Sequence, residues 1–337
     1  MTASPTLSPD PAAERAAPPP GRRFDLLAFA RKHRTILFLL LLIAVFGTVN
    51  ERFLTLRNAL NILSEVSIYG IIAVGMTYVI LIGGIDVAVG SLLACASLAA
   101  AYVVTNLIGG SPASWFVALA ISSAVGLVAG YVHGKVVTKL HVPAFIVTLG
   151  GMTVWRGATL LLNDGGPISG FDAAYRWWGT GQILFVPVPI VVFALVAAVG
   201  HVVLRYTRYG RQVYAVGGNA EAARLSGVNV SRVAMFAYVC SGALAGLAGC
   251  VLMSRLVTAQ PNEGVMYELD AIAAAVIGGT SLSGGVGSVS GTVIGAFVIG
   301  ILRNGLNMNG VSAFSQQIII GLVILVTVWI DQLRNRR

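Results

Sequence analysis

Long apolar stretches separated by short polar ones fill the chain from about residue 36 onward. A helix needs about 20 largely apolar residues to cross a membrane, and somewhat fewer where it tilts or where flanking side chains snorkel. These runs lack the alternation of a strand, and in lipid only helices or closed barrels satisfy the backbone. The pattern therefore predicts an all-α, polytopic transmembrane helix bundle with about ten spans. They lie near residues 36–51, 66–83, 87–105, 115–132, 142–162, 186–204, 233–255, 269–280, 286–302 and 316–331.

The amino-terminal segment has a different composition from the rest. It is rich in Pro, Ala, Ser and Thr, and three consecutive prolines end at Pro20. Such a segment buries too little apolar surface to fold. We therefore expect residues 1–30 to form a disordered cytoplasmic tail and residues 31–337 to form the transmembrane domain. The first apolar run follows a basic cluster that ends at Arg34, and it indicates a retained membrane helix rather than a signal peptide.

Composition and charge agree with a membrane protein. Hydrophobic residues make up 56% of the 337 residues and charged residues only 10%, whereas soluble domains carry about 25% charged residues. The net charge of +9 raises the question of nucleic acid, but basic residues gather in the cytoplasmic loops of membrane proteins. With a cytoplasmic amino terminus and an even number of spans, most of the 22 Lys and Arg residues fall inside. This distribution predicts that both termini are cytoplasmic and that nucleic acid is not a partner.

Few polar residues suggest chemistry of their own. The three cysteines and four histidines show no metal-ligand or disulfide spacing, so no metal or cofactor is predicted. Asp270 is expected outside the membrane, and the segment 303–310 is expected in a loop just outside it. The side-chain amides of that segment and those of Gln316 and Gln317 could hydrogen-bond a sugar, although a solvated loop also explains them.

The loop at about residues 205–232 is the most hydrophilic segment between two spans. Asn219 is placed to cap a short helix, Glu221 lies in its first turn, and Gly227 is placed to end it. Ser231 is placed to cap the next span. The alternatives for this loop are an inert connector and a short rigid helix that seats in a groove of a cytoplasmic partner.

Two glycine-rich segments interrupt the predicted spans. In the first, Gly83 and Gly84 permit a sharp break, and Asp86 is placed to cap a helix that starts at Val87. Breaks of this kind are tolerated where they line a cavity and often mark transport sites. Capping and packing remain the alternative explanation. The candidate residues for a transport path or gate are Gly83, Gly84, Asp86, Gly278, Gly279, Thr280 and Ser281.

Three motifs, in order, resemble one family. Glu221-Ala222-Ala223 followed by Gly227 is similar to the EAA…G pattern of permease subunits of ATP-binding-cassette (ABC) importers, and residues 208–233 resemble the ribose-type sugar permeases among them. Residues 83–91 and 277–296 resemble that family's two glycine-rich signatures. Val87-Ala88 replaces the expected Leu-Ser, which is a mild departure. The resemblance implies that an ATPase subunit is coupled through Asn219, Glu221, Ala222, Ala223, Arg224 and Gly227.

The resemblance also implies function and partners. The expected protein imports a monosaccharide or related polyol, of the ribose, xylose, arabinose, galactose or inositol class, across a bacterial cytoplasmic membrane by alternating access. Its expected partners are a cytoplasmic ABC subunit, often with two cassettes fused, a second permease copy or paralogue, an outside sugar-binding protein and membrane lipid. No GxxxxGK[ST] phosphate loop is present in the sequence, so the chain is expected to be a transport subunit rather than an ATPase.

Two other classes compete with this interpretation. A proton- or sodium-coupled secondary transporter normally uses buried acids as a relay, and Asp86 is the only good candidate for such an acid. An intramembrane enzyme needs a nucleophile with a base, or a metal set, and neither is apparent. The glycine pairs 126/130, 242/246 and 291/295 have GxxxG spacing, which predicts close helix packing within the chain or, alternatively, a dimer interface.

Overall fold

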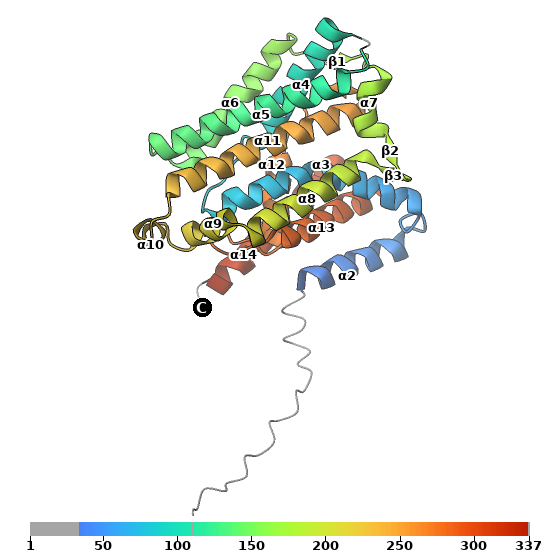
Figure 1. Ribbon diagram of the computed structural model, residues 1–337. Coiled ribbons are helices and arrows are strands. Elements are labelled where there is room, and N and C mark those ends of the chain that lie inside the picture. Colours follow the sequence, from blue (N-terminus) through green and yellow to red (C-terminus); the bar gives the residue numbers. More distant parts are fainter. Residues whose placement is uncertain (1–33, 110, 336–337) are drawn as a thin grey trace, which may run out of the picture. The chain divides into compact units, whose positions relative to one another are not determined.

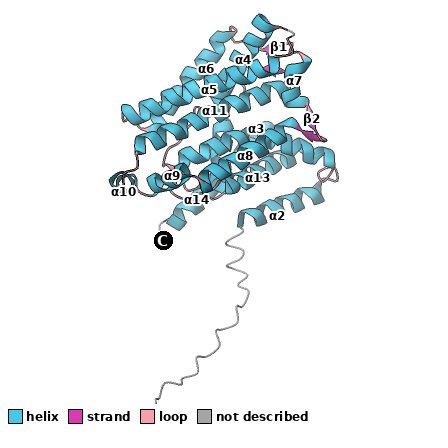
Figure 2. Cartoon of the chain, in the orientation of Figure 1, coloured by secondary structure: helices cyan, strands magenta, loops and turns pink. Residues whose placement is uncertain are grey.

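The computed structural model describes residues 34–109 and 111–335. The chain divides after Arg34, and the compact unit from Thr35 onward holds nearly all of the described residues. The tail predicted for residues 1–30 lies outside the described part. Helices dominate the described residues (Figure 2), as the sequence predicts.

The helices run in chain order as follows. They are α2 (Arg34–Val49), α3 (Leu56–Leu81), α4 (Val89–Val103) with its π-helical continuation η1 (Val104–Ile108), α5 (Ser114–Lys139), α6 (Ala144–Leu162), α7 (Ala173–Thr180), α8 (Val188–Tyr206), α9 (Arg208–Gly218), α10 (Ala220–Leu225), α11 (Val230–Leu256), α12 (Tyr267–Ile277), α13 (Val289–Met308) and α14 (Ala313–Asn335). Figure 1 shows α9 and α10 at one end of the bundle and α7 with the short strands at the opposite end.

Two small antiparallel sheets order the end that carries α7. β1 (Ile168–Ser169) pairs with β4 (Thr258–Ala259), with Ile168 opposite Ala259. β2 (Gln182–Ile183) and β3 (Val186–Pro187) form a hairpin before α8. The first pairing joins segments that are distant in sequence, so it fixes the loop before α7 to the end of α11.

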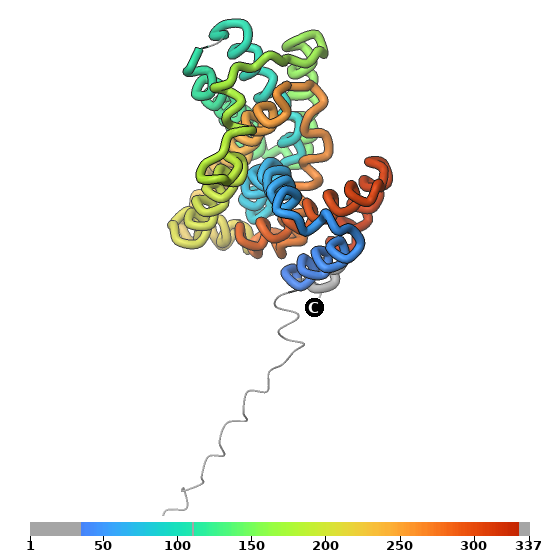
Figure 3. The backbone as a smooth tube through the Cα atoms, turned by 90° about the vertical axis from the view of Figure 1, so that its right-hand side faces the viewer, coloured from blue at the N-terminus to red at the C-terminus, as the bar shows by residue number. Residues whose placement is uncertain are grey.

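Seven helices are long and apolar enough to cross a membrane, namely α3, α4 with η1, α5, α6, α8, α11 and α13. The other three predicted spans coincide with α2, α12 and α14, which do not meet the same measure over the described residues. The multi-span helical class is therefore confirmed, and the count of ten stays a prediction. Figures 1 and 3 both place α2 and α14 along the same edge of the bundle.

Three predicted boundaries are wrong. One is the end of α5, at Lys139 rather than residue 132, and at the other two paired polar side chains extend the helices. α3 begins at Leu56, well before the expected residue 66, and its buried Asn58 exchanges hydrogen bonds with Asn304 of α13 at 3.0 and 3.1 Å. α13 continues to Met308, so Arg303 is helical rather than in a loop. Its partner is Asp270, a buried residue of α12 and not a solvated one.

Glycines form the closest helix contacts of the bundle. α5 and α11 cross so closely that a Cβ atom on Gly126 would collide with the carbonyl oxygen of Gly242, and one on Gly130 would lie 2.9 Å from the Cα atom of Val239. A Cβ on Gly291 of α13 would likewise meet the carbonyl oxygen of Gly278. The GxxxG spacing therefore serves packing within the chain, because small residues let the backbones approach.

Candidate functional site

The short helix predicted in the hydrophilic loop is present as α10. The Asn219 side chain accepts a hydrogen bond from the Ala222 amide at 2.9 Å, and Glu221 pairs with Arg224 at 3.3 Å on the exposed surface. Gly227 has a φ of 83°, and its amide and that of Val228 donate to carbonyls of α10 at 2.9 and 3.0 Å. This is the glycine-ended helix terminus that the sequence predicts. The capping of α11 by Ser231 is wrong, because Asn229 accepts from the Arg232 amide instead.

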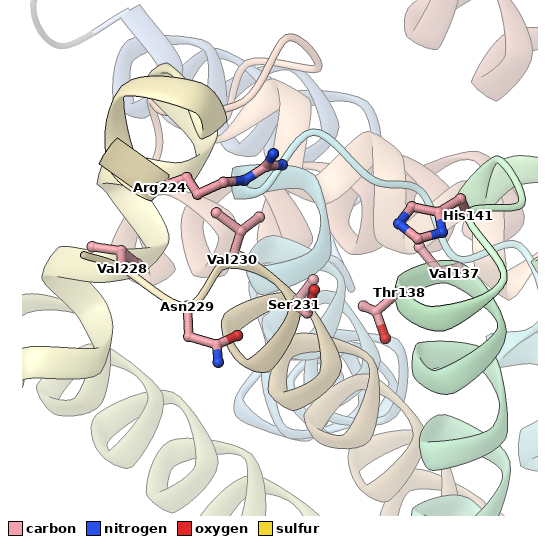
Figure 4. A pocket seen from close by; sticks show the side chains of 9 residues that line it. Val137, Thr138, His141, Arg224, Val228, Asn229, Val230 and Ser231 are labelled. Atoms are coloured by element: carbon pink, nitrogen blue, oxygen red, sulfur yellow. The ribbon is translucent and has the colours of Figure 1, made fainter. Parts of the chain in front are cut away.

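A pocket of about 500 Å³ lies between the end of α5, α10 and the start of α11. Its wall includes the hydroxyls of Thr138 and Ser231, the amide of Asn229 and the cationic Arg224. In Figure 4 Arg224 extends from one side of the pocket and His141 lies on the opposite side. The short helix therefore borders a recess rather than a flat face, which suits a protruding segment of a partner.

The end of α9 touches both glycine-rich segments. A Cβ atom on Gly217 would collide with the carbonyl oxygen of Leu81, at the end of α3, and would lie 2.5 Å from the Gly285 amide nitrogen. The Gly285 amide donates to that same Leu81 oxygen at 2.8 Å, and a Cβ on Gly284 would lie 3.0 Å from the Gly83 nitrogen. We call this meeting of residues 81–83, 217 and 284–285 the glycine junction.

Tyr214 of α9 adds a second link to the later glycine-rich segment. Its hydroxyl donates to the Gly287 carbonyl oxygen at 2.8 Å. Burial raises the pKa of this phenol, with the charge of Arg205 acting against it, so the hydroxyl stays protonated and keeps its donor role at neutral pH. α9, which leads into α10, is thus hydrogen-bonded directly to the segment between α12 and α13.

Asp86 is fully buried between α3 and α4. One carboxylate oxygen accepts from the Ala88 amide at 3.1 Å, and the other accepts from the Ser241 hydroxyl of α11 at 2.9 Å. The predicted cap of a helix from Val87 is wrong in detail, since α4 begins at Val89 without a side-chain cap. Asp86 instead ties the first glycine-rich segment to α11.

His133 of α5 completes this cluster, and sequence reasoning missed it. Its Nδ1 lies 4.0 Å from the Asp86 carboxylate, and its Nε2 accepts a hydrogen bond from the Trp155 indole at 3.0 Å. Because Nε2 accepts a hydrogen bond, the neutral ring carries its proton on Nδ1, which faces Asp86. No spacing in the sequence signals this contact, because Asp86 lies in the segment between α3 and α4 whereas His133 and Trp155 lie in α5 and α6.

The later candidate residues form a helix end and a turn. Gly279 has a φ of 94°, and its amide donates to the Val276 carbonyl oxygen at 2.9 Å. The Ser281 amide donates to the Val286 carbonyl oxygen at 2.8 Å, which closes the loop. The Thr280 hydroxyl is buried without a hydrogen-bond partner among the described residues. Gly278, Gly279, Thr280 and Ser281 thus shape the joint between α12 and α13.

Comparison with known proteins decides the family. The sequence model described as "Branched-chain amino acid transport system / permease component" matches residues 58–328. The ribose import permease protein of Escherichia coli (strain K12) is 44% identical over 315 residues, which cover 92% of this chain and 97% of that protein. The chain belongs to the ribose-type sugar permeases of ABC importers. No solved structure gives a significant match.

Two other relatives support the same assignment. The ribose import permease protein of Bacillus subtilis (strain 168) is 45% identical over 316 residues, covering 93% of this permease and 97% of the relative. The xylose transport system permease protein of Escherichia coli (strain K12) is 34% identical over 351 residues, covering 86% and 88%. The permease is therefore a multi-pass inner-membrane transport component that works with an ATPase and a substrate-binding protein.

Gly227→Val tests the end of α10 in the permease. A left-handed backbone costs an L-residue about 1–2 kcal/mol, so we expect about 5- to 30-fold less ATPase subunit to co-purify in mild detergent. Gly218→Val is the matched control, because its φ is not positive and a Cβ there meets nothing within 4 Å. Equal recovery with both variants would show that the glycine-ended geometry is irrelevant to the partner.

Asp86→Asn tests the buried carboxylate. The amide oxygen keeps one acceptor, so we expect ATP-driven uptake to stay within about threefold of the wild type. Asp86→Leu leaves the Ser241 hydroxyl and the Ala88 amide without their acceptor, at about 1–3 kcal/mol for each buried group. We expect this variant to purify in lower yield and to transport at least about tenfold less. Equal uptake by the two variants would mean that these hydrogen bonds do not position the segment.

Proposed function

We propose that the permease carries a monosaccharide or related polyol, of the ribose, xylose, arabinose, galactose or inositol class, through the membrane by alternating access. A separate ATPase subunit supplies the energy. The glycine junction is the observation that carries the mechanism. There α9, which leads into α10, contacts both glycine-rich segments through backbone atoms.

The proposed cycle begins at α10. The residues that contact the ATPase subunit in this proposal are Asn219, Glu221, Ala222, Ala223, Arg224 and Gly227. Closure of the ATPase subunits pushes α10. α9 transmits the movement because Gly217, near its end, has no side chain and its backbone packs directly against the end of α3. The push reaches the end of α3 through Leu81 and the joint before α13 through Tyr214. Both joints consist of glycines that tolerate large changes of φ and ψ.

We propose ten spans, counting α2, α12 and α14 with the seven longer helices, and cytoplasmic amino and carboxyl termini. The charge distribution supports this orientation, because it places most Lys and Arg residues inside. α9 and α10 then face the cytoplasm, and α7 with the strands faces outward. The tail at residues 1–30 is cytoplasmic in this arrangement.

The proposed assembly contains two permeases, either two copies or a copy and a paralogue, in membrane lipid. The ATPase partner carries two fused cassettes, and an outside binding protein delivers the sugar. The names of the relatives, which are ribose and xylose permeases, support the substrate class. The pairing of Asp86 with His133 is the one observation that favours a proton-coupled secondary transporter, because such pairs form proton relays.

Reconstitution separates the two mechanisms. Proteoliposomes containing the permease and its ATPase subunit, supplied with the binding protein and radiolabelled D-ribose, are expected to accumulate sugar only when ATP is hydrolysed on the side of α10. D-xylose and myo-inositol serve as competing solutes that define the class. Accumulation driven by a pH gradient without ATP, and lost in Asp86→Asn, would instead identify a secondary transporter.

A further inference from the structure

A second pocket, of about 230 Å³, lies between α12, α13 and α14 and is separate from the recess beside α10. Its polar lining comes from Asp270, Arg303, Gln316 and Gln317, and its apolar lining includes Met266 and Ile320. Pockets for drug-sized ligands measure about 300–1,000 Å³. This one is smaller, so its size suits a small solute.

The charged pair in this pocket is built into the helix packing. Arg303 Nη2 donates to both carboxylate oxygens of Asp270, at 2.8 and 2.9 Å. The Asp270 side chain is 2% exposed, whereas that of Arg303 is 29% exposed. The guanidinium is therefore the more accessible member of the pair, and the carboxylate is its buried counter-ion. The Nε atom of Arg303 is buried and has no hydrogen-bond partner among the described residues, so any contact between the guanidinium and a ligand is made through its Nη atoms.

Two amides face this pair from the first turns of α14. Gln316 donates through Nε2 to the Val311 carbonyl oxygen at 2.8 Å, which fixes its side chain and leaves its carbonyl oxygen as an acceptor. Gln317 is exposed and presents both a donor and an acceptor. Each sugar hydroxyl both donates and accepts, so a ligand rich in hydroxyls matches a wall with a guanidinium and two amides. The ion pair is neutral overall, which favours an uncharged solute.

The pocket lies toward the end of the bundle opposite α10. Tyr214 of α9 bonds to Gly287, just before α13 begins, and Arg303 lies in the last two turns of that helix. In the proposed orientation this is the outer part of the permease, where the binding protein releases its cargo.

We propose that the pocket of Asp270, Arg303, Gln316 and Gln317 is a low-affinity subsite for a neutral monosaccharide inside the permease itself. The assignment rests on the proposed sugar-import function and adds a place where the permease contacts its cargo. It gives the start of α12 a role, since Asp270 lies in the first turn of this helix and Met266 immediately precedes it.

Saturation-transfer difference NMR tests the subsite directly. Permease in lipid nanodiscs is irradiated in the presence of D-ribose, the probe chosen from the names of the relatives. We expect saturation transfer to the ribose protons with the wild type and at least about fivefold less with Gln316→Leu combined with Gln317→Leu. Ser315→Ala is the matched control, because it lies beside these residues on α14 but does not line the pocket, and it is expected to retain the signal. An absent wild-type signal, or an equal signal from the double variant, overturns the subsite.

A swapped pair separates binding from helix packing. Asp270→Arg combined with Arg303→Asp retains an ion pair between α12 and α13 but reverses the direction of its donors. We expect this variant, where it purifies as a folded protein, to give at least about fivefold less saturation transfer. A folded swap with the wild-type signal would show that the pair only joins helices and would overturn its part in the site. The glutamine variants leave the pair intact and decide the proposal if the swap does not fold.

The NMR result is independent of transport. If the wild type shows ATP-driven uptake but no saturation transfer to ribose, the subsite is rejected and the proposed function stands. If the wild type shows saturation transfer to ribose but no ATP-driven uptake, the importer mechanism is rejected and the subsite stands.

Discussion

Gly217→Val is expected to reduce ATP-driven sugar uptake by about 10- to 100-fold while the ATPase subunit still binds. The new side chain collides with the Leu81 carbonyl oxygen and meets the Gly285 amide, so α9 must separate from the glycine junction. Forcing extra atoms into a packed site costs about 1–3 kcal/mol, and displacing α9 breaks the contact that transmits the movement. The measurement is radiolabelled D-ribose uptake beside ATP hydrolysis in the same proteoliposomes.

Gly218→Val is the control for this change, because it adds the same side chain one residue later, where a Cβ meets nothing within 4 Å. It is expected to leave uptake within about twofold of the wild type. If Gly217→Val lowers uptake and ATP hydrolysis equally with less ATPase bound, the junction serves assembly rather than transmission. If uptake is unchanged, α9 does not act on the broken segments.

Glu221→Lys is expected to reduce the co-purified ATPase subunit by at least about tenfold. The change places a second cation beside Arg224, removes the ion pair at 3.3 Å and puts positive charge at the positive end of the α10 dipole. It also reverses a charge on an exposed coupling surface, and like charges across an interface cost several kcal/mol. The measurement is recovery of the ATPase subunit with tagged permease in mild detergent.

Two further variants show which effect dominates. Glu221→Gln removes the charge without reversing it, and we expect it to retain most of the ATPase. Glu221→Lys combined with Arg224→Glu restores an ion pair within α10, so recovery of ATPase binding by this double change would mean that helix stability alone matters. Full recovery with the single Glu221→Lys change would contradict a coupling role for α10.

Local patterns predicted most of the helices and the whole of α10. The Asn219 cap and the Gly227 helix end depend on residues within one short stretch, so sequence reasoning reached them directly. The apolar runs likewise located all ten helices that correspond to predicted spans. The boundary at Leu56 was missed because a lone Asn58 marks the end of an apolar run unless its partner Asn304 is known.

The site contacts across helices could not be predicted in this way. Asp86 was expected to bond locally, whereas its second oxygen reaches Ser241 in α11. The Asp270–Arg303 pair joins residues expected in solvated loops, and each residue alone is a reason to end a helix. Glycine-rich signatures indicated where the chain breaks, but not that Gly217 would meet both breaks. These contacts depend on how helices pack, and no short pattern encodes them.

The glycine contacts between α5 and α11 also restrict which parts of the permease can move. Backbone atoms of the two helices interlock at Gly126 and Gly242, so a slide of even one residue would drive a carbonyl oxygen into a Cα atom. This pair therefore behaves as a rigid frame, and the transport cycle must take place around it. Cross-linking the two helices to each other leaves such a cycle free to run, whereas cross-linking α9 to the end of α3 arrests it.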